Sequence, residues 1–267
     1  GLDEDADRTA AVRDRFPKVD AATQSDRLRY WTDVLRDLNA IPAAELSAED
    51  QVNHAIYRAQ IEALEASVRF RDFEKPFNSD SSFWAEVTGA AQRPLRNLAD
   101  YRAYLALLRD IPRHFAEHTV NMRAGLARGF SVPRVTLTGR DASIASVADM
   151  RDPEKSAFYK PFAKMPGKLS EVEQKDLRAE AVAAIKGSVL PAYSDLVKFM
   201  REEYMAKARV ALDATSYPDG KAYYQSKIRE FTTLDLSPDE AKEIQKWLEV
   251  PPPAELVDPG ATIDPQA

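Results

Sequence analysis

Apolar residues recur at helical spacing along nearly the whole chain. In one stretch Leu28, Trp31, Leu35 and Leu38 follow one another at intervals of three, four and three residues. Because an α-helix turns once every 3.6 residues, this spacing lines one side of a helix with apolar side chains. Glycine is scarce, at 9 residues, and runs of β-branched residues are almost absent. The pattern therefore predicts an all-α fold.

Capping residues and prolines place the ends of the expected helices. Ser47 with Asp50 resembles a capping box, and residues 237–240, Ser-Pro-Asp-Glu, combine a cap, a proline at the first position and an acidic first turn. Pro112 and Pro191 are expected to end or kink long helices. The expected helices lie near residues 4–16, 25–39, 47–71, 82–90, 97–111, 113–129, 133–149, 154–163, 170–189, 191–206, 218–231 and 238–249.

The expected helices are arranged as one domain followed by a tail. Only residues 70–78 and 131–138 are compatible with extended structure, so at most short strands are expected. Residues 251–267 contain five prolines and little amphipathic pattern, which is typical of polyproline-like or disordered segments. The sequence therefore predicts an irregular multi-helix array in a single domain over residues 1–250, with a Pro-rich tail over 251–267.

Composition and charge exclude several classes of function. The formal net charge is −6, and an acidic chain without a basic cluster is a poor candidate for binding nucleic acid. No apolar run reaches the roughly 18 residues that a membrane span needs. The absence of cysteine excludes disulfides, thiolate metal sites and cysteine nucleophiles. The opening stretch, GLDEDADRTA, is compatible with the mature end left by an export signal. We expect a periplasmic or exported location, with a cytoplasmic one left open.

One short stretch carries residues that suggest metal chemistry. His114, Glu117 and His118 spell H-x-x-E-H, the inverted zinc-peptidase motif. Two histidines one helical turn apart can share a metal ion, and the glutamate can act as a base. A catalytic zinc also needs a third protein ligand, and the sequence marks none. We therefore interpret the stretch as part of a scaffold helix, assign no catalytic residue or metal, and keep zinc binding as the weaker alternative.

Several separated motifs together resemble one protein family. They are R-x-G-L-x-x-G followed by V-P-R (residues 123–134), F-Y-x-P-F (158–162), L-P-A-Y (190–193) and P-x-G-x-x-Y-Y followed by T-T-x-D-L-S-P-D-E (218–240). In this order they resemble the bacterial family known as domain of unknown function 885, from about residue 25 to about residue 244.

The resemblance implies the fold of a helical zinc metallopeptidase group, of which this chain matches the N-terminal half. The zinc signature of that group is of the HExxH type and lies in a second half. HExxH does not occur in this chain, and residues 241–243, Ala-Lys-Glu, stand where the family usually has a histidine. The resemblance therefore implies zinc only where a catalytic half is present, and no cofactor is expected in this chain.

Three hypotheses about function follow. The first is a non-catalytic helical half of a peptidase-like protein that acts as a scaffold or as a module binding a peptide or partner. The second is the substrate-cleft part of a zinc metallopeptidase whose catalytic HExxH half is a missing segment or another chain. The third is a free-standing metalloenzyme that uses the H-x-x-E-H residues. We expect Tyr223, Tyr224 and Arg229 to form a cleft wall, since the matching family element leads towards the catalytic half.

The late helices are also expected to expose an apolar surface where a second half would dock. Such a surface would be covered by self-association, a partner chain or residues 251–267. The alternative is that these aromatic residues fill the local core. The residues expected on this surface are Tyr223, Tyr224, Ile228, Phe231, Ile244, Trp247 and Leu248.

Overall fold

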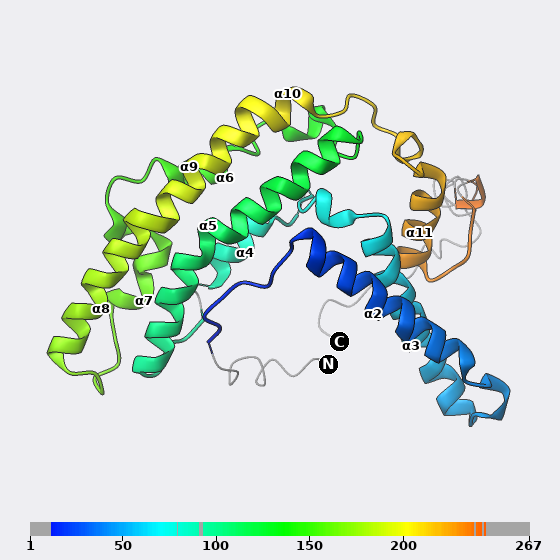
Figure 1. Cartoon of the computed structure of the whole chain (residues 1–267), viewed down its shortest axis with the longest axis horizontal. Coiled ribbons are helices and arrows are strands. Elements are labelled where there is room, and N and C mark those ends of the chain that lie inside the picture. The colour runs from blue at the N-terminus through cyan, green and yellow to red at the C-terminus, as the bar shows by residue number, and fades with distance from the viewer. Residues whose placement is uncertain (1–11, 79, 91–92, 238, 242, 244–267) are drawn as a thin grey trace, which may run out of the picture. The chain divides into compact units, whose positions relative to one another are not determined.

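The computed structural model describes residues 12–78, 80–90, 93–237, 239–241 and 243 (Figure 1). Across these residues the regular structure is helical, and the β-type pairing they contain is one bridge between Phe77 and Ser82. The predicted all-α fold with at most short strands is confirmed. The chain divides into two compact units, residues 1–213 and 214–267, which are described separately. The single domain over residues 1–250 stays a prediction, and the tail lies outside the described residues.

Most of the described helices belong to the first unit. The helices of the first unit are α2 (Ala21–Ala40), α3 (Ala48–Arg69), α4 (Phe83–Gly89), α5 (Leu98–Ala127), α6 (Ala142–Ala148), α7 (Lys160–Ala163), α8 (Glu171–Ala184), α9 (Leu190–Phe199) and α10 (Met205–Lys207). The second unit contains α11 (Gly220–Thr232).

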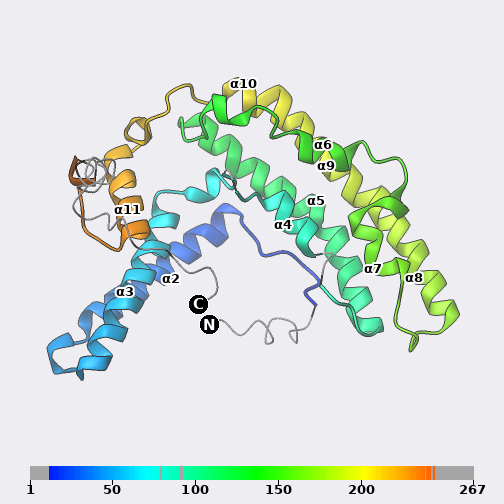
Figure 2. The same ribbon diagram turned by 180° about the vertical axis from the view of Figure 1, so that it is seen from behind.

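Helix α5 is the centre of the first unit. It begins at Asn97, whose side chain accepts a hydrogen bond from the Asp100 backbone N–H. Leu108, Ile111 and Phe115, spaced at three and four residues, are all buried. They share a core with α9 and the turn before it, and both views show α5 running beside α8 and α9 (Figures 1 and 2). The helical spacing in the sequence therefore marks the core-facing side of α5.

The sequence predicted a helix end or kink at Pro112, with separate helices over 97–111 and 113–129. The prediction of two helices is wrong, because Pro112 lies inside the single helix α5. A proline in a helix removes one backbone hydrogen bond. Ile111 and Phe115 are buried on either side of it. We infer that this core packing holds the helix together across the proline.

The predicted break at Pro191 is replaced by a local change of helical pitch. α8 ends at Ala184, a π-helical turn follows at Ile185–Val189, and α9 begins at Leu190. A second π-helical turn at Met200–Tyr204 joins α9 to α10. A wider turn before Pro191 accommodates the missing N–H without ending the helical path. The separate helices predicted over 170–189 and 191–206 are therefore one continuous helical segment.

Three further predictions of helices fail in part. The helix predicted over 154–163 consists of 3-10 turns at Pro153–Lys155 and Ala157–Tyr159 followed by the short helix α7. Residues 12–16, the described part of the helix predicted over 4–16, form an extended segment with a bend. The helix predicted over 133–149 is a 3-10 turn at Arg134–Leu137 followed by α6. The cap predicted at Ser237 is present, because its Oγ accepts from the Glu240 backbone N–H at 3.2 Å and its own backbone N–H donates to the Glu240 carboxylate at 2.8 Å. Only residues 239–241 and 243 of the helix that follows are described.

Helices α2 and α3 form a hairpin with a small core. They pack against each other, yet Leu38 and Ile61 are the buried hydrophobic residues within these two helices. Ser47 caps α3 as predicted, with its side chain accepting from the Asp50 backbone N–H. Several large apolar side chains of the hairpin are exposed, namely Tyr30, Val52, Ile56, Tyr57 and Leu64. None of the described helices combines the length and the apolar composition needed to cross a membrane.

Candidate functional site

The motif at residues 123–134 closes the C-terminal end of α5 against its neighbours. A Cβ added to Gly125 would lie 2.6 Å from the Phe130 carbonyl oxygen and 2.9 Å from that of Glu74. Gly129 has a φ of +77°, a left-handed conformation that favours glycine. Arg123 pairs with Glu203, with Nη2 2.9 Å from Oε2. These residues therefore hold the fold together rather than line a site.

Buried tyrosines connect the next two motifs to the core. The Tyr104 hydroxyl donates to the Phe158 carbonyl at 3.2 Å, within F-Y-x-P-F. The Tyr193 hydroxyl, in L-P-A-Y, donates to the Trp84 carbonyl at 2.8 Å. Burial raises the pKa of Tyr193 to about 12, so its hydroxyl stays protonated and keeps this hydrogen bond. Both motifs thus fix segments around α5.

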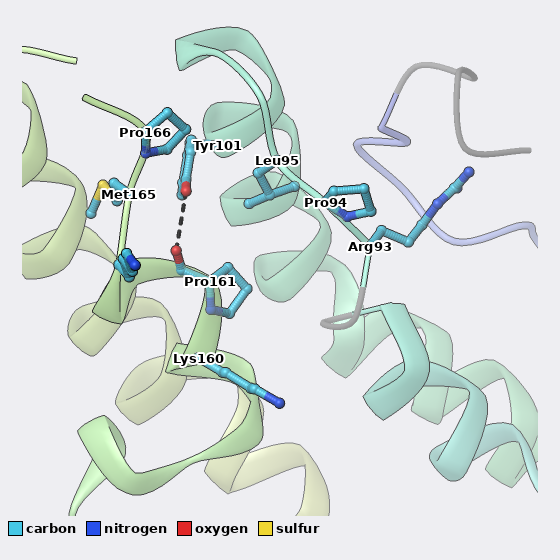
Figure 3. Close-up of a pocket in the computed structure, with 9 residues that line it drawn as sticks. Arg93, Pro94, Leu95, Tyr101, Lys160, Pro161, Met165 and Pro166 are labelled. Atoms are coloured by element: carbon cyan, nitrogen blue, oxygen red, sulfur yellow. Dashed lines mark hydrogen bonds between the residues drawn. The ribbon is translucent and has the colours of Figure 1, made fainter. Parts of the chain in front are cut away.

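One pocket of about 740 Å³ opens beside the F-Y-x-P-F segment (Figure 3). It lies between the chain that leads into α5 and the chain around α7 (Figure 3). We call it the cationic pocket and define it by its nine lining residues: Arg93, Pro94, Leu95, Tyr101, Lys160, Pro161, Lys164, Met165 and Pro166.

The cationic pocket combines buried apolar residues with charged residues. Leu95, Tyr101 and Met165 are buried, whereas Lys160 and Lys164 are exposed. The Tyr101 hydroxyl donates to the Pro161 carbonyl at 3.1 Å, which joins the two sides of the pocket (Figure 3). Burial raises the pKa of Tyr101, with Arg178 acting in the opposite direction, so the phenol is neutral at pH 7.

The charge of the cationic pocket has one sign. Its charged side chains are all positive, and no carboxylate or histidine is among the nine residues. Its volume is within the ordinary range for ligand pockets, which are mostly apolar with a few polar groups that fix orientation. This arrangement suits an anionic ligand with an apolar part.

The H-x-x-E-H residues lie on the side of α5 that packs against residues 16–19 and helix α4. His114 and His118 are both buried, with their ring centroids 4.6 Å apart. Glu117 is not aimed at a shared metal position, because it accepts from the Val19 backbone N–H at 2.8 Å and pairs with Arg113 at 2.6 Å. Within the described part of the chain, no group of three or more His, Cys, Asp or Glu residues could hold a metal ion. The described residues therefore do not fit a zinc centre.

The predicted cleft residues lie on α11, in the second unit. Tyr223 is buried, and its ring meets that of Tyr217 edge-to-face at 5.5 Å. Tyr224 is half-buried and Arg229 is exposed. Gly220 at the start of α11 has no room for a side chain, since an added Cβ would lie 2.3 Å from the Thr215 carbonyl oxygen. A cleft wall formed by Tyr223, Tyr224 and Arg229 stays a prediction.

The apolar surface predicted on the late helices has a mixed outcome. Phe231 is 81% exposed, as the prediction requires. Tyr223 and Ile228 are buried, which matches the alternative that they fill the local core. Tyr224 is half-buried, and Ile244, Trp247 and Leu248 lie outside the described residues.

Sequence reasoning missed the residues of the cationic pocket. Lys160 and Lys164 are one helical turn apart and flank a buried phenylalanine, Phe162. That spacing is a weak signal for two cations beside an apolar surface. Arg93 lies far away in the sequence, and nothing in the sequence alone connects it to the lysines. The side chain of Tyr101 is buried in the core.

Comparison with known proteins places the chain in a family. The model of the family described as "Bacterial protein of unknown function (DUF885)" matches residues 2–246. No curated protein matches the sequence. Among solved structures, the chain is similar to a protein of Colwellia psychrerythraea described as a putative lipoprotein, with a TM-score of 0.65 and 17% sequence identity.

The structural similarity covers 84% of this chain and 41% of the Colwellia protein. At 17% identity it supports the fold alone. This chain thus spans less than half the length of the structure it resembles. Since the family match extends over nearly all of the sequence, the chain belongs to the bacterial family of proteins of unknown function DUF885.

Proposed function

We propose that the chain is a non-catalytic helical binding module that holds an acidic peptide segment, free or part of a partner protein, in the cationic pocket. The observation that carries the proposal is the pocket itself, whose lining combines Arg93, Lys160 and Lys164 with buried Leu95 and Met165. An acidic peptide with apolar side chains complements both parts of this lining.

The charge of the pocket is opposite to that of the chain. The formal net charge is −6, yet the charged residues that line the pocket are all cations. A single exposed ion pair contributes little, about 0–1 kcal/mol. Lys160 and Lys164 beside one concave surface act together, and they raise the association rate and select against basic partners.

A second candidate is that the chain forms the substrate-cleft part of a zinc metallopeptidase. The observation that favours it is length, because the chain covers only 41% of the Colwellia structure. In that case the zinc ligands would lie in a different segment or in another chain, and the cationic pocket would hold part of an acidic substrate.

We also infer that the chain works outside the cytoplasm. The structural neighbour is described as a putative lipoprotein, a class of exported protein. The absence of cysteine is compatible with this location, since the fold does not depend on disulfides.

A matched pair of peptides tests the proposed binding. Fluorescence anisotropy of the full chain would use a labelled decapeptide of alternating glutamate and leucine, and the same peptide with glutamine in place of glutamate. The acidic peptide should bind more tightly, and added salt should weaken its binding. The double variant Lys160→Glu/Lys164→Glu should weaken it at least about tenfold, because two attractions become repulsions.

The control replaces two lysines outside the pocket. Lys168 and Lys175 are exposed and are not among its lining residues, so Lys168→Glu/Lys175→Glu makes the same change in net charge. It should retain most of the affinity. If both double variants lost the same affinity for the acidic peptide, binding would depend on overall charge alone, and the proposed site would be wrong.

A further inference from the structure

A second feature of the first unit, separate from the cationic pocket, is an extended segment that crosses the buried face of α5. We call residues 12–20 the strap. We propose that the strap is closed over α5 at neutral pH and is released in mildly acidic solution, because its release lets a proton reach His114.

Side chains of α5 hold the strap by its backbone. The Phe16 N–H donates to Asp110 Oδ2 at 2.9 Å, and the Phe16 carbonyl accepts from Arg113 Nη2 at 2.8 Å. The Val19 N–H donates to Glu117 at 2.8 Å, and the Val19 carbonyl accepts from Asn121 Nδ2 at 2.7 Å. Because Asp110, Arg113, Glu117 and Asn121 recur every three or four residues along α5, they form one row that binds an extended chain.

Aromatic rings cover the two histidines beside this row. The Phe16 ring stacks on His114 with centroids 4.8 Å apart, so the strap itself covers that imidazole. On the other side Phe83 of α4 stacks on His118 at 4.1 Å. The Nδ1 atoms of both histidines are buried without a hydrogen-bond partner. The closed strap therefore keeps this histidine pair in an apolar surrounding.

Burial disfavours the charged form of both imidazoles. It is the largest cause that lowers the pKa of His114, and the nearby Arg113 guanidinium lowers it further. Burial also lowers the pKa of His118 to about 3, with His114 as the second cause. In the closed state, protonation of either histidine is therefore disfavoured.

The other groups around His114 oppose this effect without reversing it. Asp110 and Glu117 favour the charged imidazole, as does the Pro17 carbonyl, and the net direction is still downward. Phe16 from the strap and Phe83 from α4 present uncharged rings. Taken together, the groups that face His114 lower its pKa while the strap is closed.

The direction of the pH effect follows from linkage. Opening exposes His114 to water, where its pKa returns towards the ordinary 6.5. His114 then binds a proton more tightly in the open state than in the closed state. The fraction of molecules with an open strap therefore grows as the pH falls below about 6.5. For one histidine with an ordinary pKa in the open state, the opening constant should rise between pH 7 and pH 5, by at most about 25-fold. Protonation of Asp110 would also favour the open strap, but only in stronger acid. Burial raises the pKa of Asp110, but its hydrogen bonds to Arg113 and the Phe16 backbone outweigh burial and lower that pKa overall.

Hydrogen exchange of the full chain measures the opening directly. The amides of Phe16 and Val19 would be followed at pH 7 and pH 5, after correction for the intrinsic pH dependence of exchange. Their opening constant should rise at pH 5, by at most about 25-fold, while amides in the core of α5 stay protected. An unchanged opening constant in the unmodified protein would overturn the proposal.

Substitutions show whether His114 is the responsible group. His114→Phe keeps an aromatic ring against Phe16 and removes the titrating nitrogen, so its strap amides should lose the pH response. His114→Gln serves the same purpose if circular dichroism shows that the phenylalanine variant does not fold. His54→Gln is the control, since His54 lies in the α2–α3 hairpin and contacts the Leu38 carbonyl. A full pH response in both His114 variants would assign the effect to the carboxylates and contradict the proposal.

Histidine titration by NMR gives an independent check. The chain contains three histidines, so single substitutions assign their signals. In Phe16→Ala the strap loses its ring on His114, and the His114 pKa should rise towards its ordinary range. An unchanged His114 pKa would show that the strap does not shield this residue.

Discussion

The H-x-x-E-H stretch of α5 and the cationic pocket beside α7 contrast in what their residues contact. The first carries residues typical of a metal site, but its glutamate binds the strap backbone and Arg113, and its histidines are buried. The second carries lysines and prolines that match no catalytic motif, and it is open. Residue type therefore indicates a function only when the side chain is not already used by the fold. The closed face of α5 should respond to mutation by losing stability, and the pocket by losing affinity.

The largest loss of stability is expected on α5 at Gly125. Gly125→Val should lower the free energy of unfolding by at least about 3 kcal/mol, because its Cβ would meet two backbone carbonyls. Gly89→Ala is the matched control, since no atom lies within 4 Å of an added Cβ there. It should change stability by less than about 1 kcal/mol. Urea denaturation of both variants measures the difference, and similar values would show that α5 is not closely packed at Gly125.

A smaller loss should appear on acidification. The folded pKa of His118 is about 3, against 6.5 for an ordinary histidine. The unfolded chain therefore takes up a proton first, and stability that is complete above pH 6.5 is lost as the pH falls towards 3. This histidine alone should reduce the free energy of unfolding by about 2–3 kcal/mol between pH 7 and pH 4.5.

The variant His118→Phe isolates this contribution. It keeps an aromatic ring against Phe83 and removes the titration, so its stability should fall less with pH than that of the unmodified protein. Denaturation at both pH values measures the two slopes. Identical slopes would contradict the burial of a neutral His118.

The smallest effect is expected from zinc, which should change nothing. A ligand that binds only the folded state raises the melting temperature. Since no described group of three ligands accompanies His114 and His118, zinc should leave the melting temperature unchanged and the chain should not cleave peptides. Zinc-dependent cleavage that His118→Ala abolishes would restore the H-x-x-E-H stretch as a metal site.

The sequence predicts the helical fold well because capping and periodicity are local. Ser47 caps α3 through Asp50, and the core face of α5 follows from its apolar spacing. The prediction that a helix ends at Pro112 was wrong because contacts with residues far away in the sequence keep α5 continuous. A local sequence pattern does not show such contacts.

The candidate sites were harder to predict for the same reason. Glu117 is engaged by Val19, which is 98 residues away in the chain. The pocket joins Arg93 to Lys160, and only the folded chain brings these residues together. Sequence patterns within a helix predicted neither arrangement.

NMR of the methionine methyl groups tests the central claim most directly. The chain has five methionines, of which Met165 lines the cationic pocket and Met122 and Met200 are fully buried in the core. Titration of the full chain with the acidic glutamate–leucine decapeptide should shift the Met165 methyl signal and leave those of Met122 and Met200 in place. Binding of the peptide without a shift of Met165 would contradict the assignment of the cationic pocket as the binding site.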